Sequence, residues 1–393
     1  MKLRAKRAIH YDPWMLISSL SLLGLGLLMV ASSSIVISDR AFNYPFYYLI
    51  RQTIYLMLGL SLAVLITRIP MAFWQKISGY LILFSFFLLL LVLMPGIGRE
   101  VNGSMRWIII GPLSLQVSEF VKLGTITFIA GYLVRRQDEV QTRVRGFIKP
   151  LLILAGIALL LLQEPDFGAT VVITATVFGM LFIAGARLWQ FIFLLVMAIC
   201  ALGVLAISVP YRLLRLTTFL HPWSNPFDTG YQLTQSLIAF GRGGVFGVGL
   251  GNSVQKLFYL PEAHTDFLFA VIGEELGLVG QLAVVMLFTI FVVRSLLVSY
   301  RAYRNGHLFS AYLGAGLSLC MGLQAMINIG VNLGLLPTKG LTLPLMSYGG
   351  TSLLVNCLVL GILFRLAYES PYKNTDMPSI ERARSVRAVP TRT

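Results

Sequence analysis

Residues 148–186 read IKPLLILAGIALLLLQEPDFGATVVITATVFGMLFIAGA, and this stretch decides the fold class. It contains two apolar runs, 148–163 and 168–186, which are separated only by the tight polar turn 163–167. Each run is close to the roughly 20 apolar residues with which a helix crosses a bilayer. The stretch therefore predicts two membrane-spanning helices that follow one another across a short turn.

Apolar runs of this kind recur along the whole chain. Of its 393 residues, 57% are hydrophobic and 12% are charged, whereas soluble domains average about 45–50% and about 25%. Further runs occupy 14–37, 49–67, 76–94, 114–134, 188–209, 266–293, 308–333 and 345–368. We therefore predict an all-α integral membrane protein, a polytopic bundle of about ten transmembrane helices.

The basic residues are divided unevenly between the two sides of such a bundle. With ten spans both termini lie on one side, which carries 21 Lys and Arg residues against 9 on the other. Cytoplasmic loops collect Lys and Arg, so both termini are predicted to be cytoplasmic. The N-terminus 1–13 is then a basic cytoplasmic segment, and 369–393 is a disordered cytoplasmic tail. This bias also accounts for the formal charge of +15, and no nucleic acid is expected as a partner.

The same topology exports three loops. The large extracytoplasmic loop connects the seventh and eighth spans at about 210–265, and the smaller ones occupy 95–113 and 334–344. The cysteines and histidines suggest no metal centre, because none of them share a metal-ligand spacing. The three cysteines lie in separate apolar runs, at Cys200, Cys320 and Cys357.

Two charged residues lie inside the fourth predicted span. Glu119 and Lys122 are three residues apart and therefore share one face of the helix. Charges within a span are functional candidates, because burying them in hydrocarbon is unfavourable. Two interpretations remain open: a structural ion pair, or a Lys122 that faces a polar cavity and binds an anion.

The segment 261–267, PEAHTDF, closes the large loop and opens the eighth span. Thr265 or Asp266 could cap the following helix. Alternatively, Asp266 lies at the membrane boundary beside an apolar wall, where partial desolvation raises its pKa and suits it to general-base work. Glu274 and Glu275 follow two helical turns later, and a buried hydrogen-bonded pair is their simpler interpretation.

Glycine and proline are concentrated in two outer segments. Six glycines lie in 241–251 around Arg242, and a glycine-rich backbone with an arginine can cradle phosphate. The segment 337–350 contains two prolines and three glycines, so it interrupts the helix. Irregular backbone at membrane depth is tolerated where it is buried or lines a cavity, and Lys339 is placed there to meet an anion. The alternatives are a flexible loop and a snorkelling lysine.

Four strings in the chain make a resemblance specific. They are QEPDFG at 163–168, NPFDTGYQLTQSLIAFGRGGVFGVGLGNSVQK at 225–256, PEAHTDFLFAVIGEELG at 261–277 and PTKGLTLPLMSYGG at 337–350. With them the chain resembles the SEDS family (shape, elongation, division and sporulation) from the first span to the tenth. The GNSVQK string and the late Thr-Lys-Gly place it closer to the division branch than to the elongation branch, which is the second choice.

The resemblance implies a peptidoglycan glycosyltransferase that polymerises lipid II at the outer face of the bacterial inner membrane, at the division septum. It implies a class B penicillin-binding protein as partner, together with other divisome membrane proteins. Asp266 occupies the family's essential aspartate. Relatives often carry Pro at Val117, and some carry a basic residue at Ser114 or Glu at Phe258. Ser114 and Phe258 are therefore given no charged role.

The mechanism that the resemblance implies uses two lipid-linked substrates. Asp266 takes the proton of the GlcNAc 4-hydroxyl of lipid II, which attacks a glycan linked to undecaprenyl diphosphate and inverts its anomeric centre. The candidate substrate- and diphosphate-binding residues are Arg106, Lys122, Arg242, Lys339, His264, Glu262 and Ser347. A divalent cation, Mg²⁺ or Mn²⁺, would be bound through the diphosphate itself, because the acidic residues form no dedicated cage.

Two other functions stay open. Ten spans with charges inside the membrane also fit a flippase that moves lipid II across the bilayer. A scaffold that only places a penicillin-binding protein is the second alternative, and it predicts that changes at Asp266 are silent.

Overall fold

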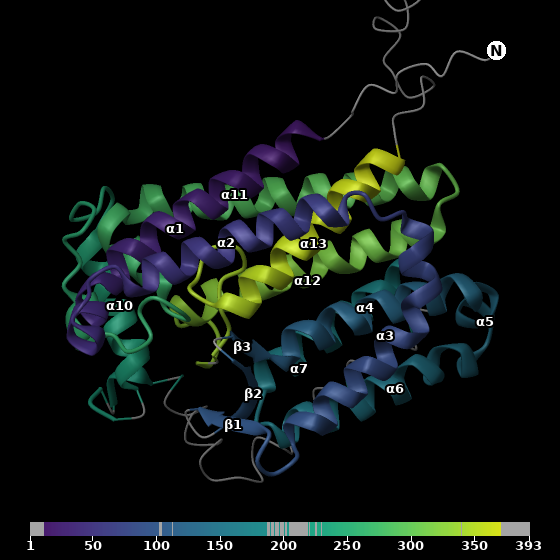
Figure 1. Cartoon of the computed structure of the whole chain (residues 1–393), viewed down its shortest axis with the longest axis horizontal. Coiled ribbons are helices and arrows are strands. Elements are labelled where there is room, and N and C mark those ends of the chain that lie inside the picture. Colours follow the sequence, from purple (N-terminus) through teal and green to yellow (C-terminus); the bar gives the residue numbers. More distant parts are fainter. Residues whose placement is uncertain are drawn as a thin grey trace, which may run out of the picture.

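The chain forms a bundle of long helices that lie side by side (Figure 1). The computed structural model describes residues 12–370 apart from 102, 103, 112, 225, 229, 339 and, within 187–220, all but 189, 192, 196, 200, 203 and 219. In this part of the chain eight helices are long and apolar enough to cross a membrane. They are α1 (Pro13–Phe42), α2 (Tyr47–Ile66), α3 (Met71–Val92), α4 (Val117–Arg135), α6 (Val144–Gln163), α11 (Leu268–Arg304), α12 (Leu308–Asn332) and α13 (Gly350–Glu369). The shorter apolar helix α7 spans Phe167–Ile183.

These helices confirm the predicted membrane bundle and correct its boundaries. Nine of the predicted spans coincide with helices, while the seventh, 188–209, lies almost entirely outside the described residues. The fourth begins at Val117 rather than at 114, because the residues just before it form a strand. The tenth begins at Gly350 rather than at 345, because an irregular buried segment precedes it.

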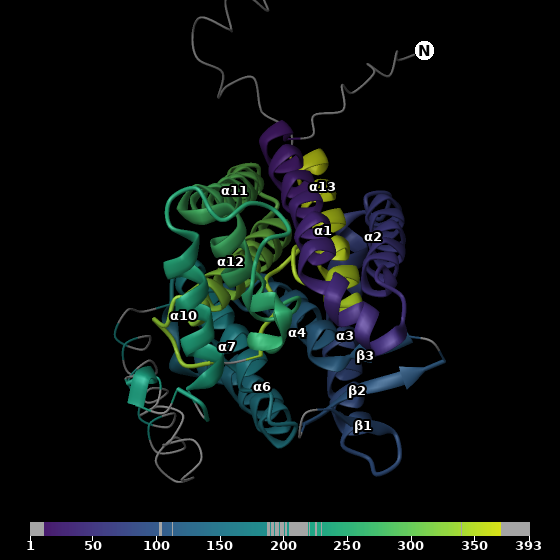
Figure 2. The same ribbon diagram turned by 90° about the vertical axis from the view of Figure 1, so that its left-hand side faces the viewer.

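A small sheet lies where the all-α prediction expects a loop. Its strands β1 (Gly98–Val101), β2 (Ser104–Ile110) and β3 (Leu113–Gln116) pair antiparallel in the order β1-β2-β3. β2 ends in three isoleucines, whose β-branched side chains favour extended backbone. The sheet lies at one edge of the bundle beside α3 and α4 (Figure 2). It matters for the site because β2 carries Arg106 and β3 leads directly into α4.

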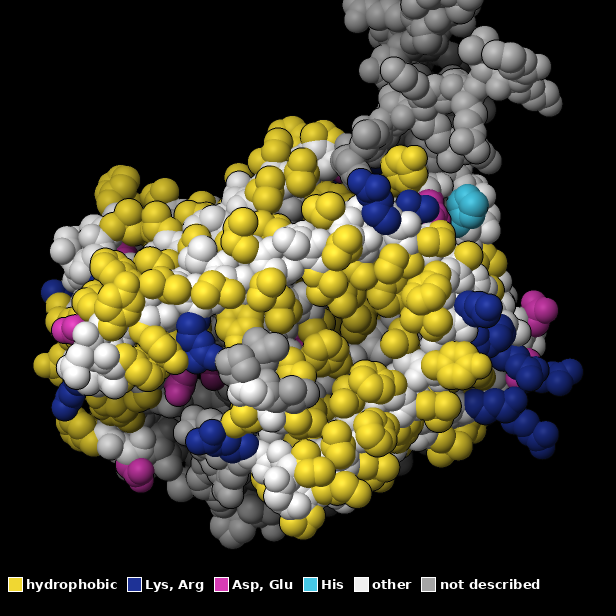
Figure 3. Space-filling view, viewed as in Figure 1, with side chains coloured by type: hydrophobic (Ala, Val, Ile, Leu, Met, Phe, Trp, Pro, Cys, Tyr) yellow, Lys and Arg dark blue, Asp and Glu magenta, His cyan; other side chains and the backbone are white. Residues whose placement is uncertain are grey.

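Both ends of the described chain lie at the same end of the bundle as α5 (Gln137–Thr142) (Figure 1). Asp12, which caps α1, pairs with Arg294 in the C-terminal half of α11 at 2.6 Å. At the other terminus, Arg365 of α13 donates to the backbone oxygen of Thr67 in the α2–α3 turn at 3.0 Å. Exposed Lys and Arg side chains gather at this end of the face shown in Figure 3, and apolar side chains cover its middle.

The opposite end carries the outer loop and a segment that folds back into the protein. The loop contains a short 3₁₀ turn (Pro222–Ser224), the helix α10 (Tyr231–Gly243) and a π-helical turn (Gln255–Tyr259). The segment 333–349 between α12 and α13 is irregular, and Leu341, Leu343, Leu345 and Met346 in it are buried. Its backbone is so close to α1 that a Cβ on Gly26 would lie 2.5 Å from the Cα of Met346. Of the alternatives that the sequence leaves open for this irregular backbone, the structure shows burial in protein.

Candidate functional site

The turn that precedes α11 presents Asp266 without using its side chain as a helix cap. The backbone N–H groups of Thr265 and Phe267 both donate to the oxygen of Glu262, which lies in the left-handed region with φ 56°. The alternative in which Thr265 or Asp266 caps α11 is wrong. The capping position is Phe267, which supplies no side-chain bond, and the Thr265 hydroxyl donates to Glu262 Oε2 at 2.6 Å instead.

Two asparagines of α12 hold the backbone of this turn. The backbone oxygen of Asp266 accepts from Asn328 Nδ2 at 2.8 Å and from Asn332 Nδ2 at 3.0 Å. Asn332 Oδ1 also accepts from the backbone N–H of Ala270 at 3.1 Å. A neighbouring helix thus satisfies one of the free N–H groups at the start of α11, and the Asp266 carboxylate stays available.

The Asp266 carboxylate lies where three segments meet. A Cβ on Gly340 would be 3.1 Å from Asp266 Oδ2, so the irregular segment runs directly past the carboxylate. The next residue, Leu341, packs against the start of α7, where a Cβ on Gly168 would lie 2.7 Å from Leu341 Cγ. The site is therefore bounded by the turn 261–267, the segment around Gly340 and the N-terminal end of α7.

Arg106 brings positive charge to this junction from β2. Its Nε donates to the backbone oxygen of Glu164 at 3.2 Å, its Nη2 donates to the oxygen of Pro165, and its Nη1 lies 4.0 Å from Asp166 Oδ1. Asp166 is buried and caps α7 by accepting from the N–H of Ala169 at 3.1 Å. The polar turn between α6 and α7 therefore fixes the guanidinium in place.

The electrostatics of the junction favour a carboxylic acid that titrates near neutrality. Burial raises the pKa of Asp266 to about 7, with Glu262 and Asp166 adding to the rise and Arg106 opposing it. Burial, helped by Asp166 and opposed by Arg106, also raises the pKa of Glu164 to about 8. Both oxygens of Glu164 are buried and have no hydrogen-bond partner among the described residues. A general base works best when its pKa is close to the operating pH, and Asp266 meets that condition.

Lys122 has the partner that a structural ion pair requires. Its Nζ lies 2.8 Å from Glu119 Oε2 and donates to Gln324 Oε1 on α12 at 2.6 Å. Both charged side chains are only 6% exposed, so the pair neutralises itself inside the bundle. Gln324 Nε2 donates in turn to the backbone oxygen of Thr342 at 3.0 Å, which links Lys122 to the irregular segment.

The other predicted site residues are distributed around the outer end. Arg242 lies at the end of α10, and its Nε is 3.7 Å from Glu274, two helical turns along α11 from Asp266. The structure therefore does not bring Arg242 to the Asp266 carboxylate. Lys339 precedes Gly340 in the chain but lies outside the described residues. Glu262 is exposed and acts on Asp266 through its charge.

His264 and Ser347 are both built into the packing of the site. The His264 ring packs against both Tyr48, at 4.8 Å between ring centroids, and Tyr348, at 5.5 Å, and the two tyrosine rings also contact each other. Burial lowers the pKa of His264, so its ring is neutral near pH 7. Ser347 is buried, and its hydroxyl accepts from the N–H of Leu343 at 2.9 Å. Its oxygen therefore closes a turn of the irregular segment.

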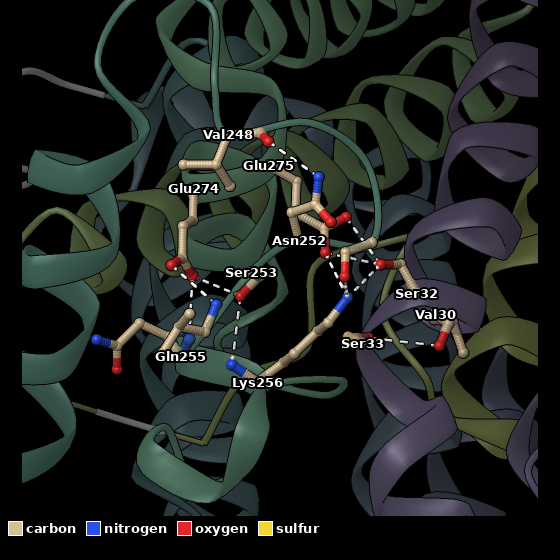
Figure 4. Close-up of polar contacts among 12 residues, drawn as sticks. Val30, Ser32, Ser33, Val248, Asn252, Ser253, Gln255, Lys256, Glu274 and Glu275 are labelled. Carbon is tan, nitrogen blue, oxygen red and sulfur yellow. Dashed lines mark hydrogen bonds and ion pairs between the residues drawn. The ribbon is translucent and has the colours of Figure 1, made fainter.

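Glu274 and Glu275 form a buried anchor for the glycine-rich loop (Figure 4). Glu274 accepts from the Ser253 hydroxyl and from two backbone N–H groups that follow it in the loop. Glu275 lies 2.7 Å from Lys256 Nζ and accepts from the Ser32 hydroxyl of α1 at 2.7 Å. Both glutamates are buried and hydrogen-bonded, as the simpler interpretation expects, but each bonds to partners in the loop or in α1 rather than to the other.

Four residues of the junction receive no role in the sequence analysis. Glu164 and Asp166 belong to a turn noted only as a polar connection, and Asn328 and Asn332 belong to an apolar span. A signal for the asparagines is present, because polar side chains one helical turn apart inside a span mark an interior-facing stripe. Among the described residues, no three His, Cys, Asp or Glu side chains gather closely enough to hold a metal ion.

Comparison with known proteins gives matches along almost the whole chain. The family described as "Cell cycle protein", which covers FtsW, RodA and SpoVE, matches residues 13–372. "Probable peptidoglycan glycosyltransferase FtsW" of Coxiella burnetii is 61% identical over 360 residues, which are 92% of this chain and 97% of that protein. The protein of the same name from Legionella pneumophila is 55% identical over 364 residues, 93% of this chain and 92% of that one.

Solved structures agree with the sequence matches. A chain described under "Structural coordination of polymerization and crosslinking by a peptidoglycan synthase complex" superimposes with a TM-score of 0.76 at 28% identity, over 93% of this chain and 100% of that one. The Thermus thermophilus rod shape determining protein RodA gives a TM-score of 0.68 at 27% identity, over 93% and 99%. The higher identity to FtsW proteins agrees with the predicted division branch. The chain belongs to the FtsW/RodA/SpoVE family of cell cycle proteins, the family that its sequence resembles.

Proposed function

We propose that this protein is a peptidoglycan glycosyltransferase that polymerises lipid II into glycan strands. The observation that carries the proposal is the Asp266 carboxylate: it is not used as a helix cap, it lies against Gly340 and its pKa is raised to about 7. The relatives named peptidoglycan glycosyltransferase, which match more than nine-tenths of the chain, support the same reaction class.

Asp266 is the general base of the proposed reaction. Its carboxylate removes the proton from the GlcNAc 4-hydroxyl of lipid II, and that oxygen forms a bond to the anomeric carbon of the donor glycan. The bond from this carbon to the diphosphate oxygen breaks at the same time, and its electron pair leaves with undecaprenyl diphosphate. Attack from the face opposite the leaving group inverts the anomeric centre. A positioned base contributes about 10²–10⁴-fold to such a step.

The leaving diphosphate requires positive charge beside the base. Arg106 supplies it in the proposal, because its side chain is 21% exposed and lies at the same junction as Asp266. Lys339, next to Gly340 in the sequence, is the second candidate. Lys122 bonds to Gln324, which in turn donates to the backbone of Thr342 in the irregular segment. In the proposal Lys122 therefore supports this segment rather than contacting the diphosphate. Mg²⁺ or Mn²⁺ is proposed to arrive on the diphosphate, since Mg²⁺ commonly binds through substrate phosphates.

The proposed setting is the bacterial inner membrane at the division septum, with both termini in the cytoplasm. The outer end, which carries Asp266 and the loop, then faces the side where glycan strands are built. The structural relative described as a peptidoglycan synthase complex supports a class B penicillin-binding protein as partner. Other divisome membrane proteins complete the proposed assembly.

Incubation of the purified protein with labelled lipid II and a divalent cation tests the proposed function. The reaction is run with and without a class B penicillin-binding protein, and the products are sized on a gel. A ladder of glycan products is expected. Movement of lipid II across sealed vesicles without any new glycosidic bond would instead establish a flippase. If neither activity is found under any partner or cation condition, the remaining alternative is a scaffold that only places a penicillin-binding protein.

A further inference from the structure

Three carboxamide side chains form a ladder on the inner face of α12. Gln324, Asn328 and Asn332 are spaced by four residues, so they lie above one another on one face of the helix. All three are almost completely buried, with exposed fractions of 2%, 2% and 0%. A buried amide in a membrane bundle must find partners, and these partners identify what the ladder holds.

The middle member joins the two segments that flank the candidate base. Both hydrogens of the Asn328 amide are used: Nδ2 donates to the backbone oxygen of Asp266 at 2.8 Å and to that of Leu341 at 2.5 Å. One rigid amide group therefore fixes the spacing between the turn that carries Asp266 and the segment whose Gly340 touches its carboxylate.

The outer members extend the ladder in both directions. Asn332 donates to the same oxygen of Asp266 at 3.0 Å, while its Oδ1 accepts from Ala270 of α11. Its own backbone oxygen accepts from the Ser236 hydroxyl of α10 at 2.7 Å. At the other end, Gln324 joins Lys122 to Thr342. The ladder thus connects α4, the irregular segment, the start of α11 and the outer loop through one helix face.

We propose that Asn328 and Asn332 are positioning residues for the general base, an inference that rests on the proposed function. The backbone oxygen of Asp266 has two buried donors, and removing one loosens the turn. Transition-state geometry is sensitive to such shifts, and a displacement of about 1 Å can reduce the rate about 10²-fold. A loosened turn also admits water to the carboxylate. The charges around it, Glu262, Arg106 and Asp166, stay in place.

The test measures the pH dependence of lipid II polymerisation by the full chain carrying Asn328→Ala. We expect kcat to fall about 10- to 100-fold, with KM for lipid II changed by less than about threefold, because the substrate contacts remain. The acid limb of the plot of kcat against pH is expected to shift to lower pH by about one unit, since better hydration of a carboxyl lowers its pKa. A purely structural defect lowers the amount of active protein without moving that limb.

A second variant and a control complete the experiment. Asn332→Ala removes the other donor to Asp266 and serves if Asn328→Ala does not fold. The control is Gln141→Ala, which removes a carboxamide bond to the oxygen of Ala184 at the opposite end of the bundle and should leave kcat and the profile unchanged. Wild-type kcat, or a reduced kcat with an unmoved acid limb, in a folded variant overturns the inference. A wild-type protein that makes no glycan contradicts the proposed function instead.

Discussion

At the scale of single residues, the chemistry of the site follows from which groups are left free. Asn332 Oδ1 accepts from the backbone N–H of Ala270 at the start of α11, and the Thr265 hydroxyl donates to the Glu262 carboxylate. Asp266 is thereby left as a partly buried carboxylate with a raised pKa. Burial disfavours the charged form, and among the described residues Arg106 is the group whose charge opposes that rise in pKa.

Glu164 predicts a pH-dependent stability at the residue scale. Its pKa rises from an ordinary 4.5 to about 8 in the folded chain. The folded chain therefore binds the proton of Glu164 more tightly than the unfolded chain does. This preference adds fully to the free energy of unfolding below pH 4.5, and the contribution is lost as the pH rises through 8. Glu164→Gln stays neutral, so its melting temperature should exceed that of wild type increasingly between pH 5 and pH 8, by roughly 3 °C or more at the upper end.

Thermal unfolding in detergent across this pH range measures the Glu164 effect. The exposed Asp138→Asn variant in α5 is the control, and it should follow wild type at every pH. A difference between Glu164→Gln and wild type that is the same at pH 5 and pH 8 would contradict the assignment of a raised pKa to Glu164.

Gly340 predicts a catalytic effect with little effect on folding. An alanine Cβ would lie 3.1 Å from Asp266 Oδ2, closer than comfortable van der Waals contact, so Gly340→Ala should displace the carboxylate. We expect kcat to fall about 10- to 100-fold while the melting temperature changes little. Gly79→Ala is the matched control, because a Cβ at that helical position meets nothing within 4 Å. Equal kcat values for the two variants would show that the carboxylate is not where the account places it.

At the scale of elements, the outer loop is held by charges buried against α11. Glu274 and Glu275 are fully buried, and the ion pair of Glu275 with Lys256 joins the loop to a membrane helix. Gly277 breaks α11 just beyond them, with φ 66°. The residue there must be glycine, because a Cβ would lie 2.4 Å from Gly247 N and 2.5 Å from the oxygen of Val245. The loop is therefore held tightly against α11 at this point.

Breaking that pair should destabilise the loop strongly. Lys256→Met leaves the Glu275 carboxylate buried without its cation, and removing one partner of a buried pair typically costs about 3–5 kcal/mol. The double variant Lys256→Met/Glu275→Leu should be more stable than Lys256→Met alone. Thermal unfolding and limited proteolysis of the loop measure both effects. Arg136→Met, which breaks an exposed pair with Glu139, is the control and should leave the melting temperature close to that of wild type.

The elements also show where sequence reasoning succeeds. Apolar run length locates most of the helices, because about 20 apolar residues have few other structures available in a membrane. It misses the sheet that carries Arg106, because three short strands are specified by pairing between segments rather than by a run of one residue type. It also starts the last span too early, since Leu345 and Met346 are apolar but belong to the buried irregular segment.

At the scale of the whole molecule, the charge bias predicts one orientation. The end that carries α5 and both described chain ends should be cytoplasmic, and the end that carries Asp266 should face outward. Alkaline phosphatase fused after Asp228 in the outer loop should be active, whereas the same enzyme fused after Thr393 should be inactive. A fluorescent protein fused after Thr393 should fluoresce. The reverse pattern would contradict the proposed orientation.

Only part of the site can be predicted from the sequence. Asp266 is identified through a motif, but its neighbours come from four separate parts of the chain: β2, the α6–α7 turn, α12 and the segment around Gly340. No local pattern states that Asn328 will hold the backbone of Asp266 or that Arg106 will lie beside Asp166. Arg242 shows the opposite limit of sequence reasoning. Its glycine-rich surroundings suggest phosphate binding, but in the structure its guanidinium pairs with Glu274.

Lipid II polymerisation by Asp266→Asn is the most direct test of the central claim. The amide keeps the size of the carboxylate but cannot accept the hydroxyl proton, so glycan synthesis should fall by at least about 10²-fold. The control is Asp39→Asn, the same change at an exposed position at the outer end of α1, which should polymerise like wild type. A normal glycan ladder from folded Asp266→Asn would contradict the claim that this carboxylate is the catalytic base.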